Sequence, residues 1–201
     1  MSGTAVRINR ERDEVEEVVY DSFISVDQYL SIEEASPVRH EYVDGVLYAM
    51  VGASKRHSEI VGNLSNAIRP HARRGQCRVF LVEVKLQVSP TRFYYPDLMV
   101  VCDSDDTDEL IATKPCLIVE VRSPGTASVD RREKASAYRQ IDSLESYLIV
   151  HQDQIRVEHY HRDENREWRI ELLTDGAVAL SCPNMQLEVA AIYEGLPAPS
   201  E

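Results

Sequence analysis

The spacing of apolar and polar positions divides the chain into helical and extended segments. Residues 25–34 carry apolar residues at helical spacing after Ser25, which predicts a short helix with Ser25 as its N-cap. Residues 54–74 have the spacing of one apolar helix face, and this helix is expected to end at Gly75. A further helix is predicted over residues 129–142.

Extended segments lie between these helices. Residues 40–43 and 46–51 are apolar runs separated by Asp44-Gly45, a pair that favours a tight β-hairpin. The run CLIVEV over 116–121 is apolar at almost every position, which indicates a central strand covered on both faces. Further strands are predicted over residues 77–88, 94–102, 147–151, 154–161 and 168–173.

This order of elements predicts a single α/β domain in which a mixed central sheet is flanked by helices. A length of 201 residues suits one domain. Residues 1–24 are charged and lack the apolar run of a signal peptide, so we expect a flexible leader. The domain then covers residues 25–195, and residues 196–201 form a disordered tail.

Charge and hydropathy narrow the function classes. No apolar run approaches the roughly 20 residues that cross a bilayer, so a cytoplasmic protein without a membrane partner is expected. The net charge of −12 argues against tight non-specific binding to DNA, because such proteins are usually basic. Two basic stretches, residues 69–78 and 131–139, leave room for local contact with a polyanion.

The cysteines and two histidines are potential metal ligands for which we expect other roles. The four cysteines form no CxxC pair, so we expect structural core thiols, since a zinc site needs tighter ligand spacing. His159 and His161 share one face of a predicted strand, but no third ligand is evident and surface histidines are expected. The cysteines are Cys77, Cys102, Cys116 and Cys182.

Carboxylates inside apolar strands give the clearest chemical signal. Asp97 interrupts FYYPDLMVVC, and Glu120 lies within LIVEV in the next core strand. Buried carboxylates are costly unless they are paired or bound to a metal. Two of them on adjacent strands favour Mg²⁺ or Mn²⁺, and the Val121 carbonyl is a further oxygen ligand.

The structural alternatives are a turn-forming Asp97 after Pro96 and a salt bridge from Glu120 to a nearby basic residue. Arg122 projects from the same face of the strand as Glu120. Lys134, on the following helix, is placed to reach back over the strand ends. A cation there would stabilise charge that develops on a phosphate.

The order and spacing of several phrases resemble the PD-(D/E)XK nuclease superfamily, and within it a large group of uncharacterised bacterial restriction endonuclease-like proteins. The resemblance spans roughly residues 25–195 and implies a restriction endonuclease-like fold, a mixed β-sheet flanked by helices. The matching phrases are HEYVDG (40–45), YYPDLMVV (94–101), LIVEVRSPGT (117–126), DRREKASAYRQI (130–141) and YLIV (147–150).

The resemblance also implies roles for individual residues. Arg122 stands where the superfamily has a lysine, and arginine cannot act as a general base because it stays protonated. Lys134 is implied as the substitute, and Glu41 as an upstream acid that binds the metal through water. His57 and Ser123 are implied to contact substrate.

The expected function is therefore Mg²⁺-dependent endonucleolytic hydrolysis of phosphodiester bonds, with DNA favoured over RNA. A non-catalytic binding or assembly module with a degenerate site is the main alternative, which Arg122 and the net charge of −12 favour. An enzyme that acts on a small phosphodiester is a third possibility. A homodimer is a further expectation, because cutting two strands needs two sites.

Overall fold

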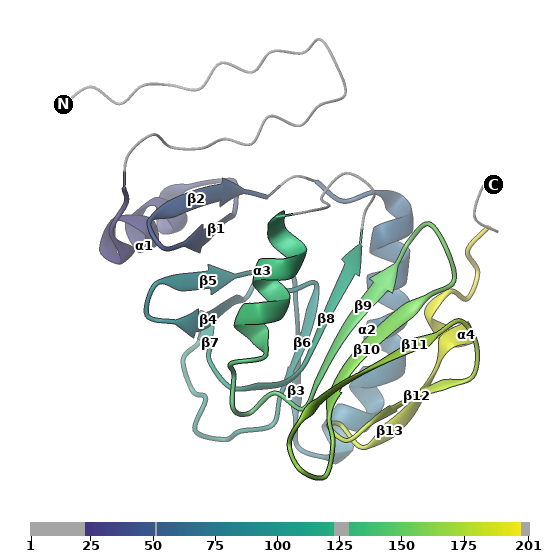
Figure 1. Cartoon of the computed structure of the whole chain (residues 1–201). Helices are drawn as coiled ribbons and strands as arrows, with labels where there is room; N and C mark the ends of the chain where they lie inside the picture. The colour runs from purple at the N-terminus through teal and green to yellow at the C-terminus, as the bar shows by residue number, and fades with distance from the viewer. Residues whose placement is uncertain (1–22, 51, 123–128, 198–201) are drawn as a thin grey trace.

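The main body of the molecule is a six-stranded mixed sheet (Figure 1). The computed structural model describes residues 23–50, 52–122 and 129–197. The strand order is β11-β10-β9-β8-β6-β3, with β8 and β9 parallel and the other neighbours antiparallel. These strands are β3 (Arg78–Leu81), β6 (Leu98–Val101), β8 (Pro115–Arg122), β9 (Ser146–His151), β10 (Val157–Arg162) and β11 (Trp168–Leu173).

One helix covers each face of this sheet (Figure 1). Helix α2 (Lys55–Arg74) packs on the face where Val119 of β8 is buried. Helix α3 (Val129–Tyr138) packs on the opposite face, where Ile118 meets Tyr138. The prediction that this strand is central and covered on both faces is confirmed.

A second, five-stranded sheet carries the N-terminal hairpin and has the order β2-β1-β5-β4-β7. Its strands are β1 (His40–Val43), β2 (Val46–Ala49), β4 (Lys85–Ser89), β5 (Arg92–Tyr94) and β7 (Ile111–Ala112). The predicted turn is confirmed: Asp44 and Gly45 both have positive φ, at 47° and 101°. Asp44 also accepts a hydrogen bond from Arg92 at 2.7 Å, so its role is structural. Helix α1 (Val26–Ala35) begins with the predicted cap at Ser25, in a capping box.

The C-terminal elements complete the core beside α2. They are β12 (Ala177–Leu180), β13 (Met185–Glu188) and the short helix α4 (Val189–Ile192). Val178, Leu187 and Ile192 are buried in the same cluster as the apolar face of α2. The sequence pattern did not predict these short elements.

Two predicted strands are each split by the structure. The run 77–88 forms β3 and β4, which belong to different sheets and are separated by a turn at 82–84. The run 94–102 is interrupted at 95–97, because β5 ends at Tyr94 and β6 begins only at Leu98. Pro96 has no N–H to donate to a strand partner, so the ladder breaks there.

The cysteines are not separate core thiols, so that prediction is wrong. Disulfides join Cys77 to Cys102 and Cys116 to Cys182, because the segments that carry them converge at one end of the main sheet. The expectation for the two termini lies largely outside the described residues. Within the described part of the chain, no helix is long and apolar enough to cross a membrane.

Candidate active site

Asp97 lies at the point where the chain enters the main sheet, immediately before β6. Its Oδ2 atom accepts a hydrogen bond from the backbone N–H of Val121 at 2.7 Å. The same oxygen lies 3.1 Å from Nε2 of His57, on the first turn of α2. Only 13% of the Asp97 side chain is exposed. The carboxylate therefore connects β6, β8 and α2 and does not sit within a continuous strand.

Glu120 lies on β8, with its side chain on the face covered by α3. Successive side chains of a strand alternate between faces, so Glu120 points away from the α2 cluster that buries Val119 and Val121. Tyr138 of α3 donates its hydroxyl hydrogen to Oε1 of Glu120 at 2.8 Å. Lys134, one helical turn earlier, places Nζ 3.4 Å from the same oxygen.

Lys134 joins the hairpin to the main sheet. Its Nζ atom lies 2.7 Å from Oε1 of Glu41 on β1, as well as near Glu120. The side chains of Lys134 and Glu41 are only 8% and 12% exposed. Oε1 of Glu41 also accepts a hydrogen bond from the backbone N–H of Tyr95 at 3.2 Å. Three residues singled out from the sequence thus meet from β1, β8 and α3.

His57 is held in a position that favours its protonated form. Burial by itself lowers its pKa, but the hydrogen bond to Asp97, the negative charge of Asp97 and a backbone hydrogen bond at Val121 outweigh burial. The pKa of His57 is therefore raised above its ordinary value. Each of the three acids lies beside a basic side chain. Asp97 is paired with His57, and Glu41 and Glu120 are both paired with Lys134.

The donor set fits a hard divalent cation by its chemistry. Asp97, Glu41 and Glu120 offer carboxylate oxygens, and Val121 offers a backbone carbonyl, which are the ligand types that Mg²⁺ and Mn²⁺ prefer. Asp97 and Glu41 are both buried, which limits competition from bulk water. In the described part of the chain, the carboxylate oxygens of Asp97, Glu41 and Glu120 are not all within 4.8 Å of one another.

The remaining predicted residues are placed less closely. Arg122 ends β8 and is half-buried, on the same face as Glu120 by strand alternation. Ser123 lies outside the described residues. Sequence reasoning missed Tyr138 and Tyr95. Tyr138 was detectable, since it follows Lys134 by four residues and so shares its face of α3.

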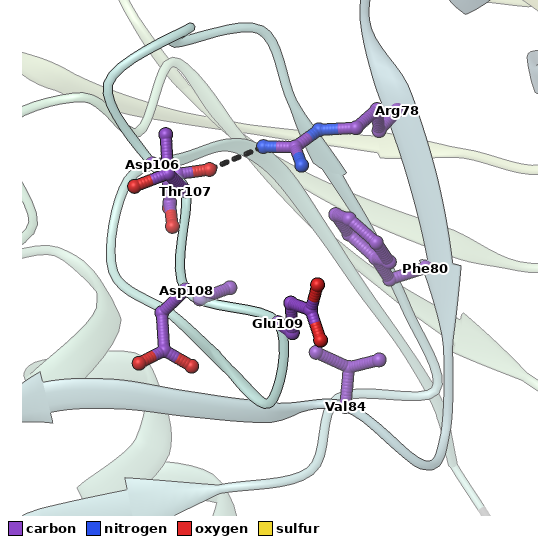
Figure 2. A pocket seen from close by; sticks show the side chains of 8 residues that line it. Arg78, Phe80, Val84, Asp106, Thr107, Asp108 and Glu109 are labelled. Atoms are coloured by element: carbon purple, nitrogen blue, oxygen red, sulfur yellow. Dashed lines mark hydrogen bonds between the residues drawn. The ribbon is translucent and has the colours of Figure 1, made fainter.

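A pocket elsewhere on the surface is lined by other residues than these acids (Figure 2). It lies between β3 and the acidic loop of residues 103–109, and Arg78 donates a hydrogen bond to the backbone carbonyl of Asp106 there. The carboxylates of this loop are used locally. Asp106 accepts from Thr113 N–H and Asp108 from Leu110 N–H, both at 2.8 Å. We therefore assign the loop a structural role.

Comparison with known proteins decides the family. A family model, Uma2, described as "Putative restriction endonuclease", matches residues 26–191. The chain belongs to the Uma2 family. This match covers Asp97, Glu120 and the helix that carries Lys134, and it supports a nuclease.

Relatives of this Uma2 chain occur in cyanobacteria. The uncharacterized protein slr1290 of Synechocystis sp. is 35% identical over 176 residues, which cover 86% of this chain and 93% of the relative. The uncharacterized protein sll1609 of the same organism is 30% identical over 165 residues, covering 80% of this chain and 93% of the relative.

A solved structure has the same fold. It is a crystal structure from Anabaena variabilis described as "a putative nuclease belonging to DUF820", with a TM-score of 0.67 and 17% sequence identity. The match covers 85% of this chain and 97% of that chain. The Uma2 chain thus has the predicted restriction endonuclease-like fold, consistent with the PD-(D/E)XK superfamily.

Proposed function

We propose that the protein is a Mg²⁺- or Mn²⁺-dependent endonuclease that hydrolyses phosphodiester bonds, with DNA as its substrate. The observation that carries this proposal is that Lys134 contacts both Glu41 and Glu120. Glu120 lies on β8, which pairs with β6, the strand that begins immediately after Asp97. Membership of the Uma2 family supports the same reaction class.

Each residue has a role in this proposal. Asp97, Glu120 and the Val121 carbonyl hold the ion, and Glu41 contacts it through water. The bound ion supplies Lewis-acid polarisation of the phosphate and a hydroxide nucleophile. Lys134 orients the attacking water and stabilises the negative charge that develops on the phosphate.

Three further residues face the substrate in this proposal. Arg122 remains protonated and neutralises phosphate charge. His57 lies beside Asp97 and contacts the substrate backbone. Ser123 follows Arg122 in the sequence and donates to a phosphate oxygen.

A non-catalytic module is the competing function, and one observation favours it. Lys134 already forms ion pairs with Glu41 and Glu120, and His57 pairs with Asp97. A buried cluster with matched charges of this kind also occurs where the role is structural, because unpaired buried charges are costly. Metal binding and cleavage separate the two functions.

The decisive experiment measures cleavage of supercoiled plasmid, single-stranded DNA and RNA with Mg²⁺ or Mn²⁺. We expect plasmid cleavage by the wild type and a loss of about 10²- to 10³-fold in Lys134→Ala, the size of effect seen when one charge-stabilising group is removed. Glu120→Gln should be inactive. Lys114→Ala is the matched control, because Lys114 pairs with Asp103 in an exposed ion pair and should retain full activity.

Calorimetry with Mn²⁺ tests the ion separately. The wild type should bind Mn²⁺ and Asp97→Ala should not, with circular dichroism confirming that both are folded. Absence of cleavage of all three nucleic acids, together with Mn²⁺ binding unaffected by Asp97→Ala, would contradict the metal-dependent nuclease and favour the non-catalytic module.

A further inference from the structure

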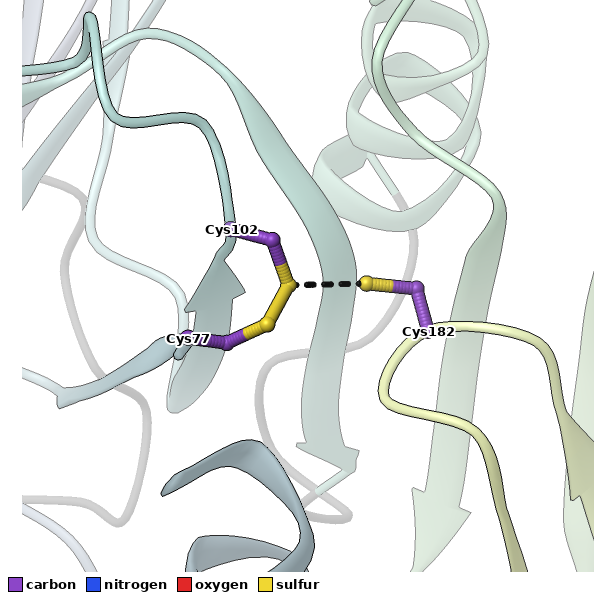
Figure 3. A group of neighbouring side chains, drawn as sticks. All are labelled: Cys77, Cys102 and Cys182. Carbon is purple, nitrogen blue, oxygen red and sulfur yellow. Dashed lines mark hydrogen bonds between the residues drawn. A yellow bond between two sulfur atoms is a disulfide. The ribbon is translucent and has the colours of Figure 1, made fainter. Parts of the chain in front are cut away.

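All four cysteines of the chain meet at the end of the main sheet away from the acids. Cys77 precedes β3, Cys102 follows β6, Cys116 lies near the start of β8 and Cys182 lies between β12 and β13. The bonded pairs are 25 and 66 residues apart in the sequence. In Figure 3 the sulfur of Cys182 faces the disulfide between Cys77 and Cys102.

The two disulfides lie against each other at unusually short range. Sγ of Cys102 is 3.1 Å from Sγ of Cys182 and 3.4 Å from Sγ of Cys116. A disulfide sulfur carries no proton, so these contacts are not hydrogen bonds. They are shorter than the roughly 3.5–4.0 Å at which even smaller carbon atoms pack. Ordinary packing of two independent disulfides therefore does not account for the arrangement.

Three of the four sulfurs lie close enough together to share one metal ion. Zinc binds four thiolates at about 2.3 Å, which places neighbouring sulfurs about 3.8 Å apart. The sulfurs of Cys77, Cys102 and Cys182 all lie within 4.8 Å of one another. Cys116 is not in this group of three, but its sulfur lies 3.4 Å from that of Cys102 and is bonded to that of Cys182, which makes it the candidate fourth ligand.

Charge next to the cluster supports a thiolate site. Four thiolates around one Zn²⁺ leave two net negative charges. Arg73 and Arg74 end α2 just before Cys77, and Arg78 follows it. This is the basic stretch 69–78, which lies at the end of α2 opposite His57 and takes no part in the proposed nuclease site. Arg78 already donates to the Asp106 carbonyl, so Arg73 and Arg74, both exposed, are the positive charges that would balance a dianionic centre.

We propose that the four cysteines bind one zinc ion when their thiols are reduced, and that the two disulfides are the oxidised form of the same site. On oxidation, four thiolates form two S–S bonds and lose four electrons to a disulfide or peroxide oxidant, releasing Zn²⁺. A thiol reductant returns two electrons to each disulfide, and the four thiolates take up zinc again.

The zinc site links elements that also pack together in the core beside α2. It ties the small β12–β13 sheet to β6 and β8 of the main sheet. Cys116 and Glu120 lie on the same strand, four residues or about 13 Å apart. Zinc bound here is thus separate from any ion held by the acids.

Cobalt reports the ligands directly, because thiolate-to-cobalt charge transfer absorbs in the near ultraviolet and carboxylate ligands do not absorb there. The full chain, reduced and freed of metal without oxygen, is titrated with Co²⁺ and then with Zn²⁺. We expect one Co²⁺ per chain with tetrathiolate absorption, which Zn²⁺ abolishes. Cys182→Ser should weaken binding at least tenfold. Glu120→Gln, altered only at the acids, should give the wild-type spectrum.

A second measurement, made on the wild type, tests the proposal even if Cys182→Ser fails to fold. Zinc-loaded wild type is oxidised with a small disulfide, and thiols and released zinc are counted together. Four thiols should disappear for each zinc released. The proposal is overturned if fully reduced chain shows no thiolate–cobalt absorption, or if zinc stays bound after all four thiols are lost.

Discussion

The hydroxyl of Tyr138 fixes the position of Glu120. Burial, and then the charge of Glu120, raise the pKa of Tyr138 well above its ordinary value, so this hydroxyl stays protonated and donates to Oε1 of Glu120. Tyr138→Phe removes the donor and leaves the carboxylate less satisfied. We expect a loss of about 1.5–3 kcal/mol in the free energy of unfolding, measured by urea denaturation. A change below about 0.5 kcal/mol, typical of surface substitutions, would show that water replaces the donor.

His159 is a buried histidine that lies away from the acids. Only 2% of it is exposed, so the prediction of a surface histidine is wrong. Its Nε2 lies 3.1 Å from Oγ of Ser146, and Nδ1 has no hydrogen-bond partner among the described residues. Burial, and then the nearby charge of His161, lower the pKa of His159 to about 4.

This lowered pKa sets a pH dependence of stability. The unfolded chain binds a proton at His159 below about pH 6.5, whereas the folded chain does not until about pH 4. Stability contributed by neutral His159 is therefore lost as the pH falls from about 6.5 to 4, by about 3 kcal/mol in total. Urea denaturation of His159→Leu should show a shallower decline over this range. Parallel curves for the two proteins would contradict the lowered pKa.

Helix α1 holds together the segments that carry Glu41 and Asp97. Glu33 of α1 is fully buried and accepts hydrogen bonds from the backbone N–H of His40 at 3.0 Å and from the hydroxyl of Tyr95 at 2.9 Å. His40 precedes Glu41, and Tyr95 is two residues before Asp97. One buried carboxylate thus sets the start of β1 relative to the break before β6.

Glu33→Gln tests this positioning role. The amide keeps the shape but weakens each charge-assisted hydrogen bond, so we expect a loss of about 2–3 kcal/mol in stability. Cleavage should fall about tenfold, with a matching shift in the Mn²⁺ concentration needed for activity. Glu34→Gln is the control, because Glu34 is exposed on the same helix. If Glu33→Gln and Glu34→Gln changed stability and cleavage equally, Glu33 would have no specific role in positioning the site.

Local signals predicted elements well and long-range contacts poorly. The hairpin at Asp44-Gly45 and the doubly covered β8 depend on local turn chemistry and on an unbroken apolar run, which the sequence displays directly. The turn at 82–84 lies inside an apolar run, so alternation alone does not reveal that β4 leaves for another sheet. The pairing of Lys134 with Glu41 links distant segments, and only the resemblance pointed to both.

Strand β11 forms an edge of the main sheet. Ile170 and Leu172 on this strand are 57% and 58% exposed. An exposed edge strand with apolar side chains offers a surface for pairing with a second copy. If the predicted homodimer forms here, Leu172→Asp should convert it to a monomer in sedimentation velocity. A wild type that is monomeric at all concentrations would contradict the prediction.

Positively charged side chains lie at both ends of α2, and only one of these ends is near the acids. Helix α2 contains 20 residues and is therefore about 30 Å long. Lys55 begins it near His57 and Asp97, whereas Arg74 ends it near the cysteines. With a net charge of −12, the protein should bind DNA weakly, and only positive charge near the acids should contribute.

Matched charge reversals at the two ends of α2 test this prediction. Lys55 and Arg74 are both exposed, so neither Lys55→Glu nor Arg74→Glu should affect folding. Fluorescence anisotropy with a labelled duplex, without divalent ions and at several salt concentrations, measures affinity. Lys55→Glu should weaken binding and lower the slope of log affinity against log salt by about 1, the effect of one lost phosphate contact. Arg74→Glu should leave both unchanged. If Arg74→Glu weakens binding as much as Lys55→Glu, DNA also contacts the cysteine end of the molecule, and the arginines there are not reserved for a metal centre.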